Sequence, residues 1–198
     1  MKEVPTHPIT FEEFLDWCDS ETRAEWVNGK VVLMSPGSRP HQDIGSFLDT
    51  ILKLYVEKHH LGVIIHAFLM HLSAPKCARE PDVLFVARER AALFRHTYLD
   101  GPADVAVEIV SPDSIERDHE QKVREYERAG VREYWLIDPM NQTTEFYEPD
   151  RHGRYRPMPV EAGVFRSRVI DGFYLRIEWL WQLPELRTID VLRELRLV

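Results

Sequence analysis

Residues 103–139 read ADVAVEIVSPDSIERDHEQKVREYERAGVREYWLIDP and contain the clearest succession of structural elements in the chain. Residues 103–110 form a nearly continuous apolar run, which is typical of a central strand covered on both faces. Residues 115–129 have helical spacing, and Gly130 follows where a helix C-cap favours glycine. A second buried strand is expected at 131–138. The stretch therefore predicts a strand–helix–strand unit with a right-handed connection and two parallel neighbouring strands.

The segments on either side of this unit add further helices and strands. Before it we expect a helix at 11–18, a hairpin turning at Asn28-Gly29, an amphipathic helix at 41–60, and strands at 62–72 and 82–87. After it we expect short antiparallel strands across 143–178 and helical structure across 179–197. This order predicts an α/β fold of the mixed α+β kind, with helices flanking a mixed central sheet and an added antiparallel β region.

Length and composition are those of an ordinary globular protein. The 198 residues suit one domain spanning 1–198, and no apolar run approaches the ~20 residues that cross a bilayer. The N-terminus MKEVPTHPIT has no apolar stretch typical of an export signal, and Cys18 and Cys77 do not have disulfide-framework or zinc spacing. We therefore expect a cytoplasmic protein with no membrane partner.

The net charge of -8 argues mildly against a nucleic-acid binder, because phosphate contacts need Lys and Arg, but the charge is unevenly distributed along the chain. Residues 151–198 hold nine Arg and six acidic residues, so this part carries +3 and residues 1–150 carry -11. A basic region on an acidic body is compatible with a polyanionic partner, and equally with pairing inside the molecule. Charge by itself therefore leaves nucleic-acid binding open.

Charged residues interrupt the apolar pattern at two strands. Ala106, Glu108 and Val110 share one face of the central strand, where an isolated carboxylate is costly to bury unless it is paired or binds a cation. A salt bridge or an exposed strand end is the competing explanation for Glu108. Asp82 begins a strand directly after Pro81, and there a simple turn residue is the alternative.

Lys122 is the third charged residue in an apolar setting, because it lies in the helical stripe expected to face the sheet. The stripe consists of Ile115, His119, Lys122, Tyr126 and Ala129. Three interpretations stay open for its ammonium. The ammonium points toward the same site as Glu108, it reaches solvent at the end of a buried aliphatic stem, or it forms an ion pair with Asp118, four residues earlier.

The two carboxylates and the lysine form a set that suits phosphodiester hydrolysis. Two carboxylates on neighbouring strands suit Mg²⁺ or Mn²⁺, which prefer oxygen ligands. Such a cation polarises a phosphodiester and lowers the pKa of a bound water, and a nearby lysine orients that water or stabilises developing charge. The sequence contains no glycine-rich phosphate loop and no Gly-x-Ser-x-Gly elbow that would indicate other chemistry.

Several short motifs surround these residues. They are Glu25-Trp26-Val27-Asn28-Gly29-Lys30 with Pro36 and His41 after it, Glu80-Pro81-Asp82-Val83, Val107 to Pro112, Asp118 with Lys122 and Tyr126, and the most specific block, Gly130 to Pro139. Together they resemble the Uma-type restriction endonucleases of the PD-(D/E)XK nuclease superfamily. The resemblance extends from about Ile9 to Leu183 and so covers nearly the whole chain.

This resemblance implies a restriction-endonuclease-like core and a DNA endonuclease that uses Mg²⁺ or Mn²⁺. Asp82 and Glu108 would bind the metal, with a main-chain carbonyl near Ile109 or Val110 as a further ligand. The superfamily lysine usually follows the second acid by two residues, a position that Val110 occupies here. The Uma-type pattern supplies Lys122 from the next helix instead. We expect a homodimer, which suits an enzyme that cuts two strands.

Other residues near these motifs have two interpretations each. Glu25 is either a further acid of the catalytic site or a partner for a basic residue in the hairpin. His41 either lines the cleft or lies at the surface. Asp138 either joins a polar network or caps the turn before Pro139. Tyr126 is expected to pack in the core with its hydroxyl near the site.

Two other classes of function compete with a nuclease. The acidic body and Val110 suit a non-catalytic or regulatory nucleic-acid-binding module on a nuclease fold, which would bind DNA without turnover. Trp179 and Trp181 could form an interaction face, although paired tryptophans belong more often to a core. Metal titration separates the first alternative from an enzyme, and the oligomeric state tests the second.

Overall fold

A mixed sheet of six strands forms the centre of the computed structural model, which describes residues 3–19, 22–112 and 114–198. In spatial order these strands are β11 (Tyr155–Pro157), β10 (Thr143–Pro149), β9 (Glu133–Asp138), β8 (Val105–Ile109), β6 (Val83–Ala87) and β3 (Gly62–His66). β8 and β9 run parallel, and the other neighbouring pairs run antiparallel. The mixed central sheet is therefore confirmed.

The strand–helix–strand unit predicted from residues 103–139 is also confirmed. β8 and β9 pair directly, with Glu108 opposite Leu136. Every residue of both strands is buried, which explains their nearly continuous apolar sequence. The connecting helix ends at Gly130, whose φ of 84° completes the left-handed C-cap.

The helix between these strands contains a π-helical segment near its start. After residues 115–116, this segment is η2 (Arg117–Lys122), which continues into α3 (Val123–Ala129). Asp118 and Lys122 are buried, whereas Ile115 is 47% exposed. The predicted apolar stripe is therefore wrong at Ile115. The reason is that a spacing of three and four residues does not hold where hydrogen bonds join residues five apart.

A second sheet of five strands accompanies the first, and the sequence did not predict it. Its order is β2 (Lys30–Leu33), β1 (Ala24–Val27), β5 (Cys77–Arg79), β4 (Leu69–Leu72) and β7 (Tyr98–Asp100). The single strand expected at 62–72 is wrong, because the chain leaves β3 after His66 and enters the second sheet as β4. Ala67, with a positive φ of 47°, lies at this break.

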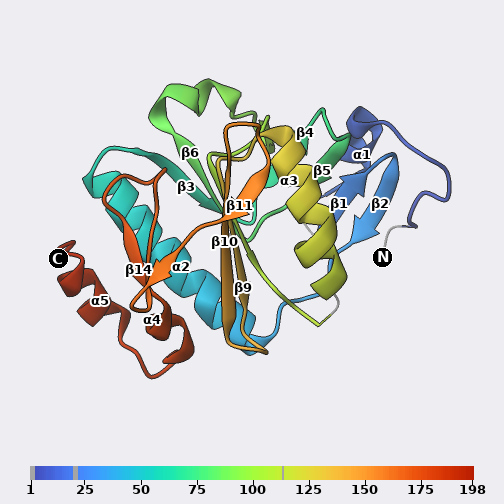
Figure 1. Cartoon of the computed structure of the whole chain (residues 1–198). Coiled ribbons are helices and arrows are strands. Elements are labelled where there is room, and N and C mark those ends of the chain that lie inside the picture. The colour runs from blue at the N-terminus through green and yellow to red at the C-terminus, as the bar shows by residue number, and fades with distance from the viewer. Residues whose placement is uncertain (1–2, 20–21, 113) are drawn as a thin grey trace.

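Helices cover both faces of the six-stranded sheet (Figure 1). On one face α2 (Arg39–Lys58) shares an apolar core with the C-terminal helices α4 (Ile177–Trp181) and α5 (Thr188–Glu194). Against the opposite face pack α3 and strands of the five-stranded sheet. Ala106 and Val110 belong to this second core, so Glu108 lies on the face that α3 covers.

Short-range signals near the N-terminus are confirmed. α1 (Phe11–Trp17) follows the expected capping box. Asn28 and Gly29 have φ of 49° and 86°, as a two-residue hairpin turn requires. The long helix α2 begins before His41, because the Ser38 side chain accepts a hydrogen bond from the His41 backbone N–H and caps the helix.

The C-terminal part forms the added antiparallel β region. β12 (Val160–Glu161), β13 (Val164–Arg166) and β14 (Tyr174–Arg176) make a separate three-stranded sheet. The helical structure expected across 179–197 is divided between α4 and α5, and Trp179 belongs to the core. A short 3₁₀ helix, η1 (Arg88–Leu93), lies earlier in the chain. None of the described helices is both long and apolar enough to span a membrane.

Candidate functional site

The three residues singled out in the sequence converge on one cleft. Asp82 directly precedes β6, Glu108 lies in the neighbouring strand β8, and Lys122 ends η2. Their exposed fractions are 8%, 3% and 1%. The three side chains line a small cleft of about 70 Å³, which His41 and Ile109 also border. The sheet and its covering helix therefore bring distant parts of the sequence together.

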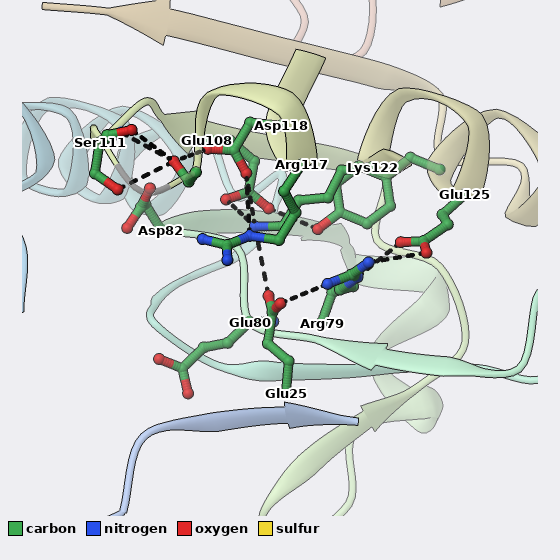
Figure 2. A network of polar contacts seen from close by, with 12 residues as sticks. Glu25, Arg79, Glu80, Asp82, Glu108, Ser111, Arg117, Asp118, Lys122 and Glu125 are labelled. Atoms are coloured by element: carbon green, nitrogen blue, oxygen red, sulfur yellow. Dashed lines mark hydrogen bonds and ion pairs between the residues drawn. The ribbon is translucent and has the colours of Figure 1, made fainter. Parts of the chain in front are cut away.

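Lys122 occupies the centre of a network of charged side chains (Figure 2). Its Nζ lies 2.7 Å from Glu108 Oε2, 3.3 Å from Asp118 Oδ1 and 3.4 Å from Glu25 Oε1. Burial acts to lower the pKa of Lys122, but the three carboxylates outweigh it and raise the pKa well above its ordinary value. The ammonium therefore points toward Glu108 and also pairs with Asp118, and it does not extend to water.

Glu108 is held at both carboxylate oxygens. Oε2 faces Lys122, and Oε1 accepts a hydrogen bond of 2.6 Å from the Tyr126 hydroxyl. Burial raises the pKa of Glu108 to about 8, and the nearby carboxylates of Asp118 and Asp82 act in the same direction while Lys122 opposes them. Glu108 is thus a buried, partnered carboxylate, and the Tyr126 hydroxyl does reach the site.

Asp82 is oriented by the neighbouring strand. Its Oδ2 accepts a hydrogen bond of 2.8 Å from the Ile109 backbone N–H. Its Oδ1 lies 3.2 Å from His41 Nε2, and the His41 side chain is only 12% exposed. His41 therefore lines the cleft from the first turn of α2. Asp82 contacts residues of β8 and α2, so it is more than a simple turn residue.

Glu25 lies on the far side of Lys122 and is fully buried. It accepts hydrogen bonds from Arg79 Nη1 at 2.6 Å and from the Glu80 backbone N–H at 3.2 Å. Burial acts to raise the pKa of Glu25, but Lys122 and Arg79 hold it below its ordinary value. The basic partner of Glu25 comes from β5 and not from the hairpin turn, and Arg79 itself also binds Glu125. Glu25 therefore joins the network around Lys122.

Asp138 has a separate role in the turn between β9 and β10. Its Oδ1 accepts hydrogen bonds from the backbone N–H groups of Met140 and Asn141 at 2.8 and 3.1 Å. Its Oδ2 accepts one of 2.7 Å from the Asn141 side chain. Burial acts to raise the pKa of Asp138, but these hydrogen bonds keep it below its ordinary value. The turn-capping interpretation of Asp138 is therefore confirmed.

Sequence reasoning missed further members of the network. The Ser114 hydroxyl donates a hydrogen bond to Asp118 Oδ2, and Arg117 Nε lies 3.8 Å from Asp118 Oδ1. A signal was present, because Ser114, Asp118 and Lys122 recur at every fourth position, a spacing that makes helical side chains neighbours. Arg79 carried no such signal, since β5 is too short to show alternation.

The chemistry of the donor set fits a divalent cation. The carboxylates of Asp82 and Glu108 border one cleft beside the Ile109 backbone. Five carboxyl groups face three fixed cations in the network, which makes an excess of two negative charges when all five are ionised. The carboxylates belong to Glu25, Asp82, Glu108, Asp118 and Glu125, and the cations to Arg79, Arg117 and Lys122. One divalent cation would neutralise this excess.

The number of side-chain ligands is small for such an ion. Among the described residues, no group of three or more His, Cys, Asp and Glu side chains is arranged to hold a metal by itself. Mg²⁺ is commonly held by one or two carboxylates, with water and substrate phosphate completing its shell. Asp82 and Glu108 fit that kind of site and not an all-protein cage.

Comparison with known families decides what kind of protein has this site. The model of a family named Uma2, described as "Putative restriction endonuclease", matches residues 11–178. The chain belongs to the Uma2 family. The matched residues include every member of the charged network around Lys122. The family expected from the sequence motifs is therefore confirmed.

A solved structure supports the same fold for this Uma2-family protein. It is a crystal structure of a "putative nuclease belonging to DUF820" from Anabaena variabilis, with a TM-score of 0.74 and 20% sequence identity. The similarity covers 88% of this chain and 98% of that chain. The expected mixed α/β architecture, with a mixed sheet flanked by helices, is thus confirmed. No curated protein matches the chain.

Proposed function

We propose that this Uma2-family protein is a metal-dependent endonuclease that hydrolyses phosphodiester bonds of DNA. The observation that carries the proposal is the convergence of Asp82, Glu108 and Lys122 on one cleft between neighbouring strands and their covering helix. The Uma2 family and the nuclease-like fold support a nuclease function. The geometry adds a specific division of roles among the residues.

Asp82 and Glu108 are the proposed ligands of Mg²⁺ or Mn²⁺, with the Ile109 main-chain carbonyl as a further ligand. When bound, such a cation lowers the pKa of a water molecule and offsets negative charge on the phosphate. The chain supplies the orientation, because the Ile109 N–H holds one oxygen of Asp82 and the Tyr126 hydroxyl holds one oxygen of Glu108. Both carboxylates are therefore positioned before a substrate arrives.

Lys122 is proposed to act through its charge and not as a base. Its pKa is raised well above the ordinary value by the surrounding carboxylates, so it keeps its proton at neutral pH. A fixed ammonium in a buried site orients a water molecule and stabilises negative charge that develops on the phosphate. Glu25 does not line the cleft but contacts the ammonium at 3.4 Å, so we assign it as a positioning residue for Lys122.

The proposal is tested by cleavage of supercoiled plasmid and of single-stranded DNA in the presence of Mg²⁺ or Mn²⁺. Asp82→Asn and Glu108→Gln keep the shape of the side chains and remove the charges, and each should reduce the rate at least ~100-fold. Glu120→Gln is the matched control, because Glu120 lies on the same helix and is 61% exposed. Cleavage that survives both cleft substitutions would contradict the proposal.

A non-catalytic DNA-binding module is the second candidate. The observation that favours it is the close contact of Lys122 with Glu108, which already satisfies one of the two proposed metal ligands. Such a module would bind DNA without turnover and without a metal requirement. Calorimetric titration separates the two candidates, since binding of Mn²⁺ that is lost in Asp82→Asn supports the enzyme.

A homodimer remains part of the proposal, because cutting both strands of a duplex calls for two active sites. Size-exclusion chromatography with light scattering is the direct test. A measured mass equal to that of one chain at every concentration would exclude the homodimer. It would not affect the active-site assignment.

A further inference from the structure

The proposed cleft has an acidic lining, and its central cation is already engaged. Asp82, Glu108 and Asp118 all border the cleft. Lys122 is 1% exposed and has three carboxylates within 3.4 Å. A phosphodiester strand is an anion, and its approach depends on cations whose charge is not already neutralised. Without a bound metal, that charge has to come from another residue at the cleft.

Two arginines also line the cleft, and their environments differ. Arg23 is paired with Glu80, whose Oε1 accepts hydrogen bonds from Nε at 3.0 Å and from Nη2 at 2.6 Å. Among the described residues, the one carboxylate within ion-pair distance of Arg117 is Asp118, whose Oδ1 lies 3.8 Å from Nε and so beyond hydrogen-bonding distance. That Nε is buried and donates no hydrogen bond to any residue that the structure describes. Arg117 is therefore the less neutralised of the two.

The carboxylate near Arg117 is also shared with other groups. Asp118 lies 3.3 Å from Lys122 Nζ through Oδ1, and it accepts a hydrogen bond from the Ser114 hydroxyl through Oδ2. Its negative charge is thus divided between two cations. Among the described residues, an anion that bound the guanidinium of Arg117 would compete only with this shared carboxylate, at 3.8 Å.

Arg117 also lies where the cleft meets a second hollow. This groove lies between the β1–β2 hairpin and η2, and it is lined by Val27, Asn28, Lys30, Val32, Arg79, Glu116, Arg117 and Gln121. Arg117 lines both hollows, and in Figure 2 its guanidinium extends toward the Asp82 side of the network. The side chain is 19% exposed and lines both hollows, so part of it is accessible to a ligand.

We propose that Arg117 is the phosphate-binding residue of this cleft and contacts a phosphodiester oxygen of the nucleic-acid strand that enters it. The inference rests on the proposed nuclease function only in placing the scissile phosphate of that strand near Asp82 and Glu108. A guanidinium presents a planar fork of N–H donors that matches two phosphate oxygens, which a lysine ammonium does not. Lys30 on the groove wall adds positive charge along the path away from the cleft.

The test is DNA affinity, measured by fluorescence anisotropy with a labelled oligonucleotide in EDTA and again in Ca²⁺, over a series of salt concentrations. Arg117→Ala should weaken binding roughly 10-fold or more, because a charge-assisted hydrogen bond is lost. The slope of log affinity against log salt should fall by about one phosphate contact. Arg117→Lys should keep the salt slope and show an intermediate affinity, since it keeps the charge and loses the fork.

Arg124→Ala is the matched control. Arg124 lies on the same helical segment, is 73% exposed and is paired with Glu120 at 3.6 Å, so its loss should leave affinity within about twofold. Arg117→Ala with unchanged affinity and salt slope would overturn the inference, and so would an equal loss in Arg124→Ala. A wild-type protein that binds no oligonucleotide under either condition would also overturn it.

These readouts separate the inference from the nuclease proposal. Binding that depends on Arg117 in a protein that never cleaves DNA supports the inference and refutes the nuclease. Cleavage by a protein whose affinity and salt slope are unchanged in Arg117→Ala refutes the inference and leaves the nuclease. Thermal unfolding is recorded for both variants, and Arg117→Lys provides the test if Arg117→Ala does not fold.

Discussion

At the scale of single residues, Lys122 shows how a cation is accommodated in the interior. Burying an ion costs several kcal/mol unless opposite charges and hydrogen bonds surround it. Three carboxylates lie within 3.4 Å of its Nζ. The arrangement is reciprocal, because the same ammonium keeps Glu25 and Glu108 from being uncompensated buried charges. Loss of either partner should therefore cost more stability than loss of a surface ion pair.

Lys122→Met should lower the free energy of unfolding by about 3–5 kcal/mol in metal-free buffer, because it leaves buried carboxylates without their cation. Chemical denaturation measures this loss. Lys53→Met on the exposed face of α2 is the control and should change stability little. Adding Glu108→Gln to Lys122→Met should recover part of the loss, since one of the unpaired charges is removed. A Lys122→Met protein as stable as the control would contradict this account.

Glu108 should contribute a pH dependence of defined sign. Burial, with help from neighbouring carboxylates, raises its pKa from the ordinary value of 4.5 to about 8 in the folded protein. The folded state then binds the proton more tightly than the unfolded state. This contribution to stability is fully present below about pH 4.5 and is lost as the pH rises through about 8.

Glu108→Gln lacks this titrating proton, so it isolates the effect. The melting temperature of the wild type minus that of Glu108→Gln should fall steadily as the pH increases from about 5 to about 8. Calorimetry in metal-free buffer at several pH values measures the difference. If this difference in melting temperature stays constant or grows with pH, the effect of Lys122 on the pKa of Glu108 outweighs the effect of burial.

At the scale of elements, left-handed turns determine where the segments that carry site residues begin and end. The hairpin at Gly29 sets the direction of β1, which carries Glu25. Gly130 ends α3, which follows directly on the π-helical residues that carry Asp118 and Lys122. The π geometry buries these two charges on one side of the helix, so the element itself forms one wall of the site.

Gly29→Ala and Gly130→Ala should differ in cost. Both positions have positive φ, which costs an alanine about 1–2 kcal/mol. Nothing lies within 4 Å of a Cβ added at Gly130, whereas one at Gly29 would lie 2.9 Å from Pro8 Cβ. Gly130→Ala should therefore lose about 1 kcal/mol and Gly29→Ala about 2–3 kcal/mol in urea unfolding. Equal losses would mean that the segment at Pro8 moves aside freely.

At the scale of the whole molecule, part of the net negative charge lies at the proposed metal site. The cleft network alone has two more carboxylates than cations. Repulsion among these groups opposes folding in the absence of metal. A ligand that neutralises them and binds only the folded chain should therefore stabilise the entire protein.

Mn²⁺ or Mg²⁺ should raise the melting temperature of the wild type, and a chelator should reverse the rise. At a free metal concentration ~100 times the dissociation constant, the gain should be about 2.7 kcal/mol. Asp82→Asn and Glu108→Gln should abolish the gain, and Glu120→Gln should retain it. A melting temperature that is insensitive to both metals would contradict the metal site without affecting the fold.

The sequence by itself determined the features that depend on neighbouring residues. The buried strands β8 and β9, the hairpin at Asn28-Gly29 and the helix end at Gly130 were all predicted, because apolar periodicity and turn chemistry act over a few residues. Asp82 and Glu108 were recognisable for the same reason, since each is a charge at or within an apolar strand. Motifs along the chain also indicated the Uma2 family, which the match over residues 11–178 confirmed.

How these elements meet depends on long-range packing. The break between β3 and β4, the partnership of Glu25 with Arg79, and the incomplete pairing of Arg117 all depend on residues far apart in the chain. The π geometry of η2, in which Asp118 is buried, was not predicted from the helical spacing of residues 115–129. The physical reason is common to all of them. A buried charge is stable only beside particular partners, and long-range packing, not local pattern, chooses those partners.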